Sequence, residues 1–428
     1  MKWRMRYLTM FVSALLLVAL SFVLWTSNQK KILRIEVYAG SSWDVPNSRE
    51  NRVLDNIIRQ FEKSYPNVKV VYESGIPKKD YDNWLAEKIL KGEQLDVFMV
   101  PENDFSMLAS SGAFKSLDSL ISKEEAAAYY PVAYQAGQYQ GHSYALPIES
   151  NPVMMCVNKD LLEKEGISIP NSNWTLEDLY AICQKVTKDT DGDSLIDQYG
   201  ITDYTWKQAL VAYNGHLRNQ NGVNVDSVEM HQALSFISKL DSLNQRYKVT
   251  SNDFDEGKVA FYPMSLAQYR TYKPYPYHVA KYSRFSWTCI PMPAAKAGIP
   301  ATQVKTSLFA MSSKTKQDKL AWEFMKLLCQ NQKNQQELFA KSQGTSVLTS
   351  VVKSSQTKKI LQADDLGLDS LTSQRLDHMM KHSVLDISRD LDYHSLERLD
   401  YLLGNALKNN EIDSILPSIQ REMEETGK

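Results

Sequence analysis

The sequence predicts an α/β fold that extends over more than one domain. At roughly 150 residues per domain, a chain of 428 residues has room for two or three domains. The composition is that of a folded protein, because 43% of the residues are hydrophobic and 23% are charged. Short apolar strands alternate with amphipathic helices in the amino-terminal part, and this order builds a largely parallel sheet covered by helices.

The first elements follow from the spacing of apolar residues. Residues 33–37 alternate apolar and charged side chains, which predicts a half-buried strand. Residues 54–61 place apolar side chains on one helical face, and residues 68–72 alternate again as a second strand. A helix at 84–90 and a continuous apolar strand at 97–100 repeat the pattern.

The later elements continue the alternation. Thr175 is expected to cap a helix, with Asp178 supplying the carboxylate of a capping box three residues on. From residue 361 onward the pattern is almost entirely helical. The other expected elements are strands at 152–157, 259–262 and 306–311, helices at 228–243 and 316–329, and a Pro- and aromatic-rich loop at 272–287.

The amino terminus carries an export signal. Residues 7–25 form an uncharged, mostly apolar run of 19 residues, which at 1.5 Å per residue covers most of a hydrocarbon core of about 30 Å. Lys2, Arg4 and Arg6 precede the run, and this order predicts that the rest of the chain lies outside the cytoplasm. We expect residues 1–30 to remain as an uncleaved anchor, so that the body is held at the outer face of the membrane; a cleaved signal and a secreted protein are the alternative.

Composition and motifs exclude several classes of function. The 49 basic and 50 acidic residues leave a net charge of -1, so no basic excess favours nucleic acid as a partner. Nucleophile elbows, phosphate-binding glycine loops and dinucleotide fingerprints are missing from the sequence, and we expect no catalytic residues and no required cofactor. The four cysteines, scattered singly without CxxC spacing, are expected to be buried thiols.

One acidic segment is a candidate calcium site. Carboxylates recur at every second residue, as a hard cation requires, and the segment resembles half of an EF-hand loop. Gly200 stands at the twelfth place, where that loop has Glu, so a plain polar turn is an equally good interpretation. The candidate metal ligands are Asp189, Asp191, Asp193 and Asp197.

Aromatic residues in loops suggest a carbohydrate ligand. Trp43, Trp206 and Trp287 are expected in loops, where a large ring is useful if a sugar stacks on it. Carboxylates and amides would bind the sugar hydroxyls. Each residue has an ordinary structural role as its alternative. The candidate ligand-binding residues are Tyr38, Trp43, Glu102, Asp104, Glu149, Asn151, Tyr204, Trp206, Tyr262 and Trp287.

A series of short segments resembles one known family. Each is degenerate alone, but their order and spacing together are specific. They are residues 61–70, 96–98, 112–118, 144–147, 158–160, 174–177, 189–200, 257–260 and 319–324. By these segments the chain resembles the extracellular solute-binding proteins of bacterial ABC importers, in the family that binds sugars and oligosaccharides.

The resemblance implies a two-lobed periplasmic-binding-protein-like fold with crossing hinge strands, preceded here by the hydrophobic anchor. The implied crossings lie at residues 147–151, 290–306 and 345–349. The expected first lobe comprises residues 31–148 and 306–347, and the second comprises 149–305 and 348–428. The chain departs from the family at residues 25–27, where no cysteine is present to carry a lipid.

The function implied is capture of a carbohydrate outside the cell and delivery to the membrane subunits of an ABC permease by closure of the lobes. We expect a monomer. Three alternatives stay open: a binder of a non-sugar solute such as a peptide, polyamine or metal; a ligand sensor for a membrane signalling receptor; and a glycoside-processing enzyme. The separation of the candidate carboxylates Glu102, Asp104 and Glu149 would test the last.

Overall fold

The computed structural model describes residues 30–43, 45, 50–73, 75–93, 95–245, 247–272, 285–364 and 370–426. The expected anchor at residues 1–30 lies almost wholly outside them, as does most of the expected loop at 272–287. Among the described helices, none is both long and apolar enough to cross a membrane.

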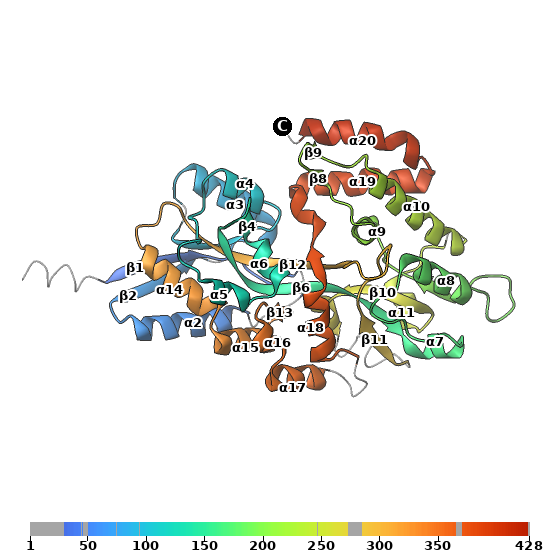
Figure 1. The fold of residues 1–428 in the computed structure, drawn as a ribbon, viewed down its shortest axis with the longest axis horizontal. Coiled ribbons are helices and arrows are strands. Elements are labelled where there is room, and N and C mark those ends of the chain that lie inside the picture. Colours follow the sequence, from blue (N-terminus) through green and yellow to red (C-terminus); the bar gives the residue numbers. More distant parts are fainter. Residues whose placement is uncertain are drawn as a thin grey trace, which may run out of the picture.

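Two lobes lie side by side along the long axis of the molecule (Figure 1). The first lobe packs around one large hydrophobic cluster. The elements within the expected bounds of the first lobe are β1 (Lys31–Glu36), α2 (Glu50–Ser64), β2 (Val68–Glu73), α3 (Lys78–Leu90), β3 (Val97–Val100), α4 (Phe105–Ser110), α5 (Lys123–Ala127), α6 (Pro131–Ala136), β4 (Gln138–Tyr139), β5 (His142–Ser143), α14 (Asp318–Cys329) and α15 (Gln332–Lys341).

The second lobe packs around a second cluster, and a third cluster contains residues of both expected lobes. The elements within the expected bounds of the second lobe are α7 (Lys159–Lys164), α8 (Leu176–Val186), β7 (Tyr199–Ile201), α9 (Trp206–Ala212), β8 (Arg218–Asn219), β9 (Gly222–Val223), α10 (Val228–Leu243), α11 (Ser251–Asp255), β10 (Val259–Ser265), α12 (Leu266–Tyr272), β11 (Trp287–Ile290), α16 (Thr349–Val352), α17 (Ser355–Asp364), α18 (Ser373–Lys381), the 3-10 turn η1 (Ile387–Asp390), α19 (Tyr393–Asn409) and α20 (Ile412–Thr426).

One continuous sheet joins the lobes through β6 (Ala145–Asn158) and β12 (Thr302–Met311). The strand order is β2-β1-β3-β12-β6-β10-β7. β11 and β13 (Thr345–Ser346) pair with β6, and β14 (Ser383–Leu385) pairs with β12. β1 is parallel to β2 and β3, as predicted, whereas β12 runs antiparallel to β3 and β6.

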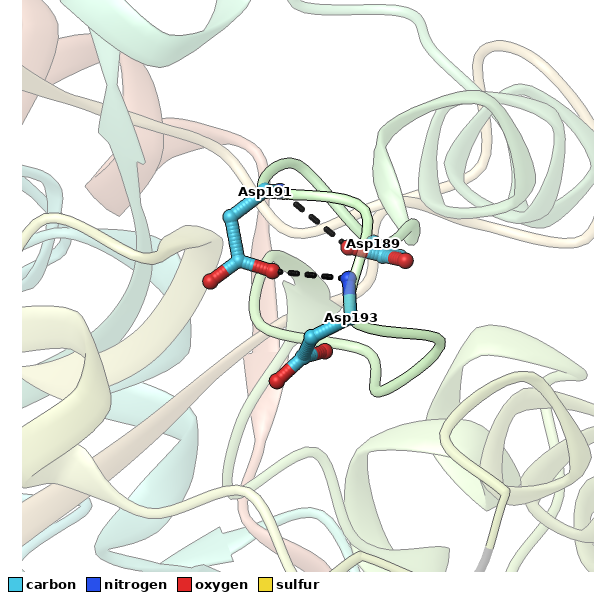
Figure 2. Close-up of side chains that lie close together, drawn as sticks. All are labelled: Asp189, Asp191 and Asp193. Atoms are coloured by element: carbon cyan, nitrogen blue, oxygen red, sulfur yellow. Dashed lines mark hydrogen bonds between the residues drawn. The ribbon is translucent and has the colours of Figure 1, made fainter.

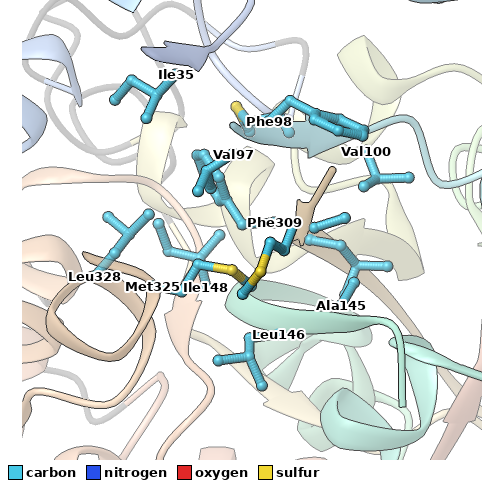
Figure 3. Close-up of a cluster of buried hydrophobic side chains, with 14 of the residues drawn as sticks. Ile35, Val97, Phe98, Val100, Ala145, Leu146, Ile148, Phe309, Met325 and Leu328 are labelled. Carbon is cyan, nitrogen blue, oxygen red and sulfur yellow. The ribbon is translucent and has the colours of Figure 1, made fainter. Parts of the chain in front are cut away.

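The first core shows why the predicted elements form. Ile35 of β1, Phe98 of β3 and Phe309 of β12 are at most 2% exposed. By the strand register Ile35 and Phe309 lie on one face of the sheet, and Phe98 lies on the other, where it packs on Phe114 with ring centroids 5.8 Å apart. Met325 and Leu328 of α14 belong to the same cluster (Figure 3). The apolar face of α2 lies on the same cluster. Burial of these side chains supplies the main free energy that holds the helices on the sheet.

Local signals in the sequence are confirmed in the second lobe. The Asp178 N–H donates to Thr175 Oγ1 at 3.2 Å, and the Thr175 N–H donates to Asp178 Oδ2 at 2.8 Å, which completes the expected capping box. Trp174 precedes this cap and packs on Phe261, with ring centroids 5.3 Å apart. The helix begins one residue after the predicted cap.

The expected lobe boundaries remain a prediction. The third cluster contains Tyr129 and Tyr130, from the segment assigned to the first lobe, together with Leu348 and Leu376, assigned to the second. Hydrophobic packing is therefore continuous beneath the strands that join the lobes.

Candidate functional site

Three strands cross between the lobes at one level of the sheet. β6 pairs with β12 at Ser150 and Thr306, whose hydroxyl oxygens are 3.0 Å apart. β6 pairs with β13 at Glu149 and Ser346. The register of β6 against β12 shifts beside Ser307, and such an irregularity bends a strand locally. We call residues 149–151 and their partners on β12 and β13 the crossing.

Glu149 is a buried carboxylate at the crossing. It is 2% exposed, and its Oε1 accepts the Gly344 N–H at 2.7 Å and the Ser342 hydroxyl. Burial raises the pKa of Glu149 to about 7, although these hydrogen bonds and the positive charge of Arg270 oppose the rise. Glu149 therefore holds the segment before β13 against β6.

Gly344 is required by this close approach. A Cβ atom at this position would lie 2.6 Å from Glu149 Oε1 and 2.7 Å from its Cγ. Carbon atoms essentially never approach that closely, so only glycine fits without displacing the Glu149 side chain.

The second lobe is fastened to the crossing through α12. Arg270 Nη1 donates to the Gly344 carbonyl at 2.8 Å, and the guanidinium lies 4.7 Å from the centre of the Phe339 ring. Asn151 Oδ1 accepts the Ala267 N–H at 2.9 Å. The expected ligand residues Glu149 and Asn151 are thus largely engaged by the protein itself.

Tyr38 and Trp43 lie in the first lobe beside the crossing. Tyr38 and Glu149 line a mostly apolar cavity of about 70 Å³. Trp43 Nε1 is buried and completes no hydrogen bond with the described residues, although the indole N–H is close enough to lower the pKa of Glu149. Both aromatic rings are less than one-tenth exposed.

Glu102 and Asp104 follow β3 and face the carboxy-terminal part of the chain. Burial, followed by repulsion from Asp386, raises the pKa of Glu102 to about 7. Burial, followed by repulsion from Asp82 and Asp392, raises the pKa of Asp104 to about 6. Carboxylates of the first lobe and carboxylates of the segment leading into α19 are therefore close neighbours.

Residues 383–392, which we call the carboxy-terminal strap, run beside β12 between α18 and α19 (Figure 1). In this strap, Arg389 Nη2 donates to the Ala136 carbonyl at 3.3 Å, and its guanidinium lies 5.7 Å from the Phe105 ring. Arg389 and Lys305 both lower the pKa of Glu102, though less than burial raises it. The strap thus contacts the first lobe through Arg389 and leads into α19.

Sequence reasoning missed Tyr393 and His394 at the start of α19. Burial raises the pKa of Asp82 on α3, and the nearby Lys78 and His394 oppose this rise. Asp392 faces Asp104. Tyr393 is 58% exposed, which is unusual for so large a ring. Its sequence neighbours have a helical pattern, so nothing in the sequence marks Tyr393 as an aromatic residue of a loop.

The other four candidate residues lie farther into the second lobe. Tyr204 packs on Phe236 with ring centroids 6.2 Å apart. Trp206 Nε1 donates to Asp400 Oδ1 at 2.8 Å. Tyr262 on β10 lies against the Phe254 ring at 5.4 Å. Each is a packed residue with protein partners.

The predicted loop positions of Trp206 and Trp287 are wrong. Trp206 is the first residue of α9, and Trp287 is the first residue of β11. Trp287 pairs with Asn158, at the end of β6 remote from the crossing, and packs on Tyr269 with ring centroids 5.3 Å apart. The neighbouring polar and Pro residues are typical of loops, but packing against distant parts of the chain places Trp206 in a helix and Trp287 in a strand. Ligand contact by either tryptophan stays a prediction.

The acidic segment of the sequence forms an exposed loop (Figure 2). Ligand oxygens of Asp189, Asp191 and Asp193 lie within 4.8 Å of one another. Asp189 also accepts the N–H groups of Gly192 at 2.7 Å and Ser194 at 2.8 Å, so the turn has its own hydrogen bonds. The fourth expected ligand, Asp197, instead accepts the N–H of Thr190 at 2.9 Å and its hydroxyl at 2.6 Å.

Residues 56–364 match the family described as bacterial extracellular solute-binding proteins. The chain belongs to this family. As a solute-binding protein of an extracellular family, its body works outside the cytoplasm, as expected from the sequence. The two-lobed fold with crossing strands, expected from the sequence, is confirmed.

Known proteins resemble this solute-binding protein in sequence or in fold. It is similar to the maltotriose-binding protein of Pyrococcus abyssi, with 25% identity over 32% of this chain and 30% of that protein. The match thus spans about a third of that relative. The sugar-binding protein MalE of Xanthomonas citri has a similar structure, with a TM-score of 0.73 and 15% identity over 92% of this chain and 97% of that one. A Listeria monocytogenes ABC substrate-binding protein in complex with cycloalternan gives a TM-score of 0.64 and 18% identity, over 93% and 99% of the chains.

Proposed function

We propose that the protein captures a carbohydrate outside the cell and delivers it to an ABC-type membrane permease by closing its two lobes. The observation that carries the proposal is that polar side chains of the first lobe lie near the start of α19. Asp104 faces Asp392, and Asp82 lies near His394. The exposed ring of Tyr393 stands between Asp392 and His394 in the chain. A sugar presents hydroxyls and an apolar face, and carboxylates with an aromatic ring complement both.

Closure follows from this two-sided arrangement. A ligand that contacts Asp104 on one side and Tyr393 on the other binds best when the lobes approach. Its differential affinity shifts the hinge equilibrium toward the closed state. No group in this account forms or breaks a bond to the ligand, and we propose a binding protein rather than an enzyme. Sugar ligands of similar proteins, maltotriose and cycloalternan, support the proposal.

The proposal includes the setting of the protein. We propose that the apolar amino-terminal run anchors it at the outer face of the cytoplasmic membrane, that it works as a monomer, and that its closed form is read by the permease subunits. Uptake of labelled sugar by cells with and without the gene product tests delivery, and a fractionation experiment tests the anchor.

The first experiment is a thermal-melt screen of the purified protein against mono- and oligosaccharides, amino acids, peptides, polyamines and metals. A ligand at 100 times its dissociation constant stabilises the native state by about 2.7 kcal/mol, which shifts the melting temperature clearly. We expect a shift with one class of sugar. A shift with peptides or polyamines alone contradicts the carbohydrate proposal and leaves the family unchanged.

A cationic solute is the second candidate, and a specific observation favours it. Glu102 of the first lobe faces Asp386 of the strap, and Asp104 faces Asp392. A polyamine or an amine-bearing ligand would offset the repulsion among these carboxylates. The same screen separates the two candidates.

Replacing Tyr393 by Ala is expected to weaken carbohydrate binding by about 1–3 kcal/mol, because a stacking ring contributes that much at comparable surfaces. Titration calorimetry with the sugar found in the screen measures the change. Tyr401→Ala, which removes a 62% exposed ring two turns farther along α19, is the matched control and should bind normally. Equal affinities for the two variants would remove Tyr393 from the site.

We also propose that the Asp189 loop binds calcium weakly, with Asp189, Asp191 and Asp193 as ligands. Millimolar calcium outside cells makes even weak affinity effective. Calcium is expected to raise the melting temperature of the wild type but not that of Asp193→Asn. Asp413→Asn is the control, because the Asp413 side chain is 94% exposed and lies outside the loop, and its melting temperature should rise with calcium as that of the wild type does. If calcium left the melting temperature of the wild type unchanged, the loop would be a turn held by its own hydrogen bonds and not a calcium site.

A further inference from the structure

Two of the four cysteines face each other across neighbouring strands. Cys156 on β6 is paired with Cys289 on β11, and their Sγ atoms lie 3.6 Å apart. Cys183 on α8 and Cys329 on α14 belong to two other hydrophobic clusters. The sequence, with cysteines 133 residues apart, gave no sign of this pairing.

The strand register places the two residues at a close pair. The Cys289 N–H donates to the Ser370 carbonyl at 2.8 Å, which points it away from β6. In an antiparallel ladder, residues whose N–H groups point outward form the pair with Cα atoms about 4.5 Å apart and the side chains closer together. That spacing falls inside the range of about 4.4–6.8 Å that a disulfide requires.

The movement needed to form a bond is small. The sulfurs must approach by about 1.5 Å from their present 3.6 Å to reach the S–S bond length of about 2.05 Å. Rotation about the two Cα–Cβ bonds on fixed strands supplies a displacement of this size, because both side chains already project to the same face.

The compartment favours oxidation. The family is extracellular, and disulfides form and persist in extracytoplasmic spaces. Both sulfurs are 0% exposed, so an oxidant reaches them only before β11 docks on β6 during folding. After docking, the same burial shields the bond from reductants.

We infer that Cys156 and Cys289 form a cross-strand disulfide in the exported protein. The reaction is thiol–disulfide exchange with a disulfide-bearing oxidant, either a small disulfide or a thiol oxidoreductase. One cysteine thiolate attacks the oxidant and releases one thiol; the second cysteine then attacks the mixed disulfide and releases the other. Two protein thiols lose two hydrogens, and the oxidant is reduced to two thiols.

Cys183 and Cys329 serve as internal controls. Each is fully buried, and burial raises the pKa of both thiols. They lie in separate clusters with no cysteine partner among the described residues of those clusters, so both remain thiols while the Cys156–Cys289 pair is oxidised.

The test uses the full-length protein recovered from the outside of the cell. It is denatured without reductant in the presence of an alkylating agent, digested and mapped by mass spectrometry. We expect two alkylated cysteines, Cys183 and Cys329, and one cross-linked peptide pair that is about 2 Da lighter than its two thiol peptides. Reductant added before alkylation should release all four.

Alkylation of Cys156 and Cys289 without reductant would overturn the inference, as would a cross-link to either other cysteine. A double Cys183→Ala, Cys329→Ala variant should keep the same cross-link. If that variant fails to fold, the wild-type map alone decides, because it needs no substitution.

Discussion

The free energy of unfolding of the Gly344→Ala variant is expected to be about 2–4 kcal/mol lower than that of the wild type. The added Cβ would lie 2.6 Å from Glu149 Oε1, so the carboxylate must move. Movement breaks its hydrogen bonds from the Gly344 N–H and the Ser342 hydroxyl. A buried carboxylate without these donors then remains at the crossing, and that loss accounts for the size of the effect.

Urea unfolding followed by circular dichroism measures this change. Gly404→Ala is the matched control, because Gly404 lies in α19 with open space around its Cβ position. That substitution is expected to stabilise the protein by up to about 1 kcal/mol, since alanine favours a helix over glycine. Equal stability of Gly344→Ala and the wild type would show that the approach of Gly344 to Glu149 is not required.

The second large effect concerns pH. The wild type should become more stable as the pH falls from 8 to 5, because the pKa values of Glu102 and Glu149 are raised to about 7 in the folded state. Between their ordinary pKa of 4.5 and about 7, the folded protein binds protons that the unfolded chain does not. Stability is therefore greatest at the acidic side of this window and falls as pH rises through it.

Glu102→Gln isolates one of these groups. The amide keeps the size of the side chain and removes the buried charge, so the variant should exceed the wild type in stability at pH 8 and match it near pH 5. The rise of the pKa of Glu102 from 4.5 to about 7 corresponds to a stability difference on the order of 3 kcal/mol at pH 8. Melting temperatures of both proteins across this range provide the measurement.

Glu87→Gln is the control for this experiment. The Glu87 carboxylate is exposed, and its hydrogen bond with Lys91 lowers its pKa, so its removal should leave the slope between pH 5 and pH 8 unchanged. If Glu102→Gln followed the wild-type curve throughout, the carboxylates that face the strap would not be desolvated as the structure places them.

Much of the fold could be predicted because its signals are local. The helix at 228–243 and the strand at 97–100 have the predicted bounds, since their apolar spacing lies within a single element. The capping box at Thr175 involves residues three apart. Each of these features is decided by neighbours in the chain.

The parts that could not be predicted depend on distant contacts. β14 is three residues long and is a strand only because it pairs with β12, some eighty residues earlier, within a region whose pattern is helical. Trp287 has loop-like neighbours but is buried on a strand. The proximity of Glu102 to Asp386 and of Cys156 to Cys289 requires the assembled sheet.

β6 has a consequence for how this protein can evolve. It is a single strand that pairs with β12 and β13 at its first half and with β10 and β11 at its second. The boundary between the lobes therefore runs through the middle of a ladder and not through a linker. A recombination that exchanged one lobe for that of a relative would have to divide this strand. Duplication of the whole gene leaves the strand intact, and substitutions can then change the side chains that lie between the lobes. New ligand specificities in this architecture are expected to arise from side-chain changes on an inherited pair of lobes rather than by exchange of modules.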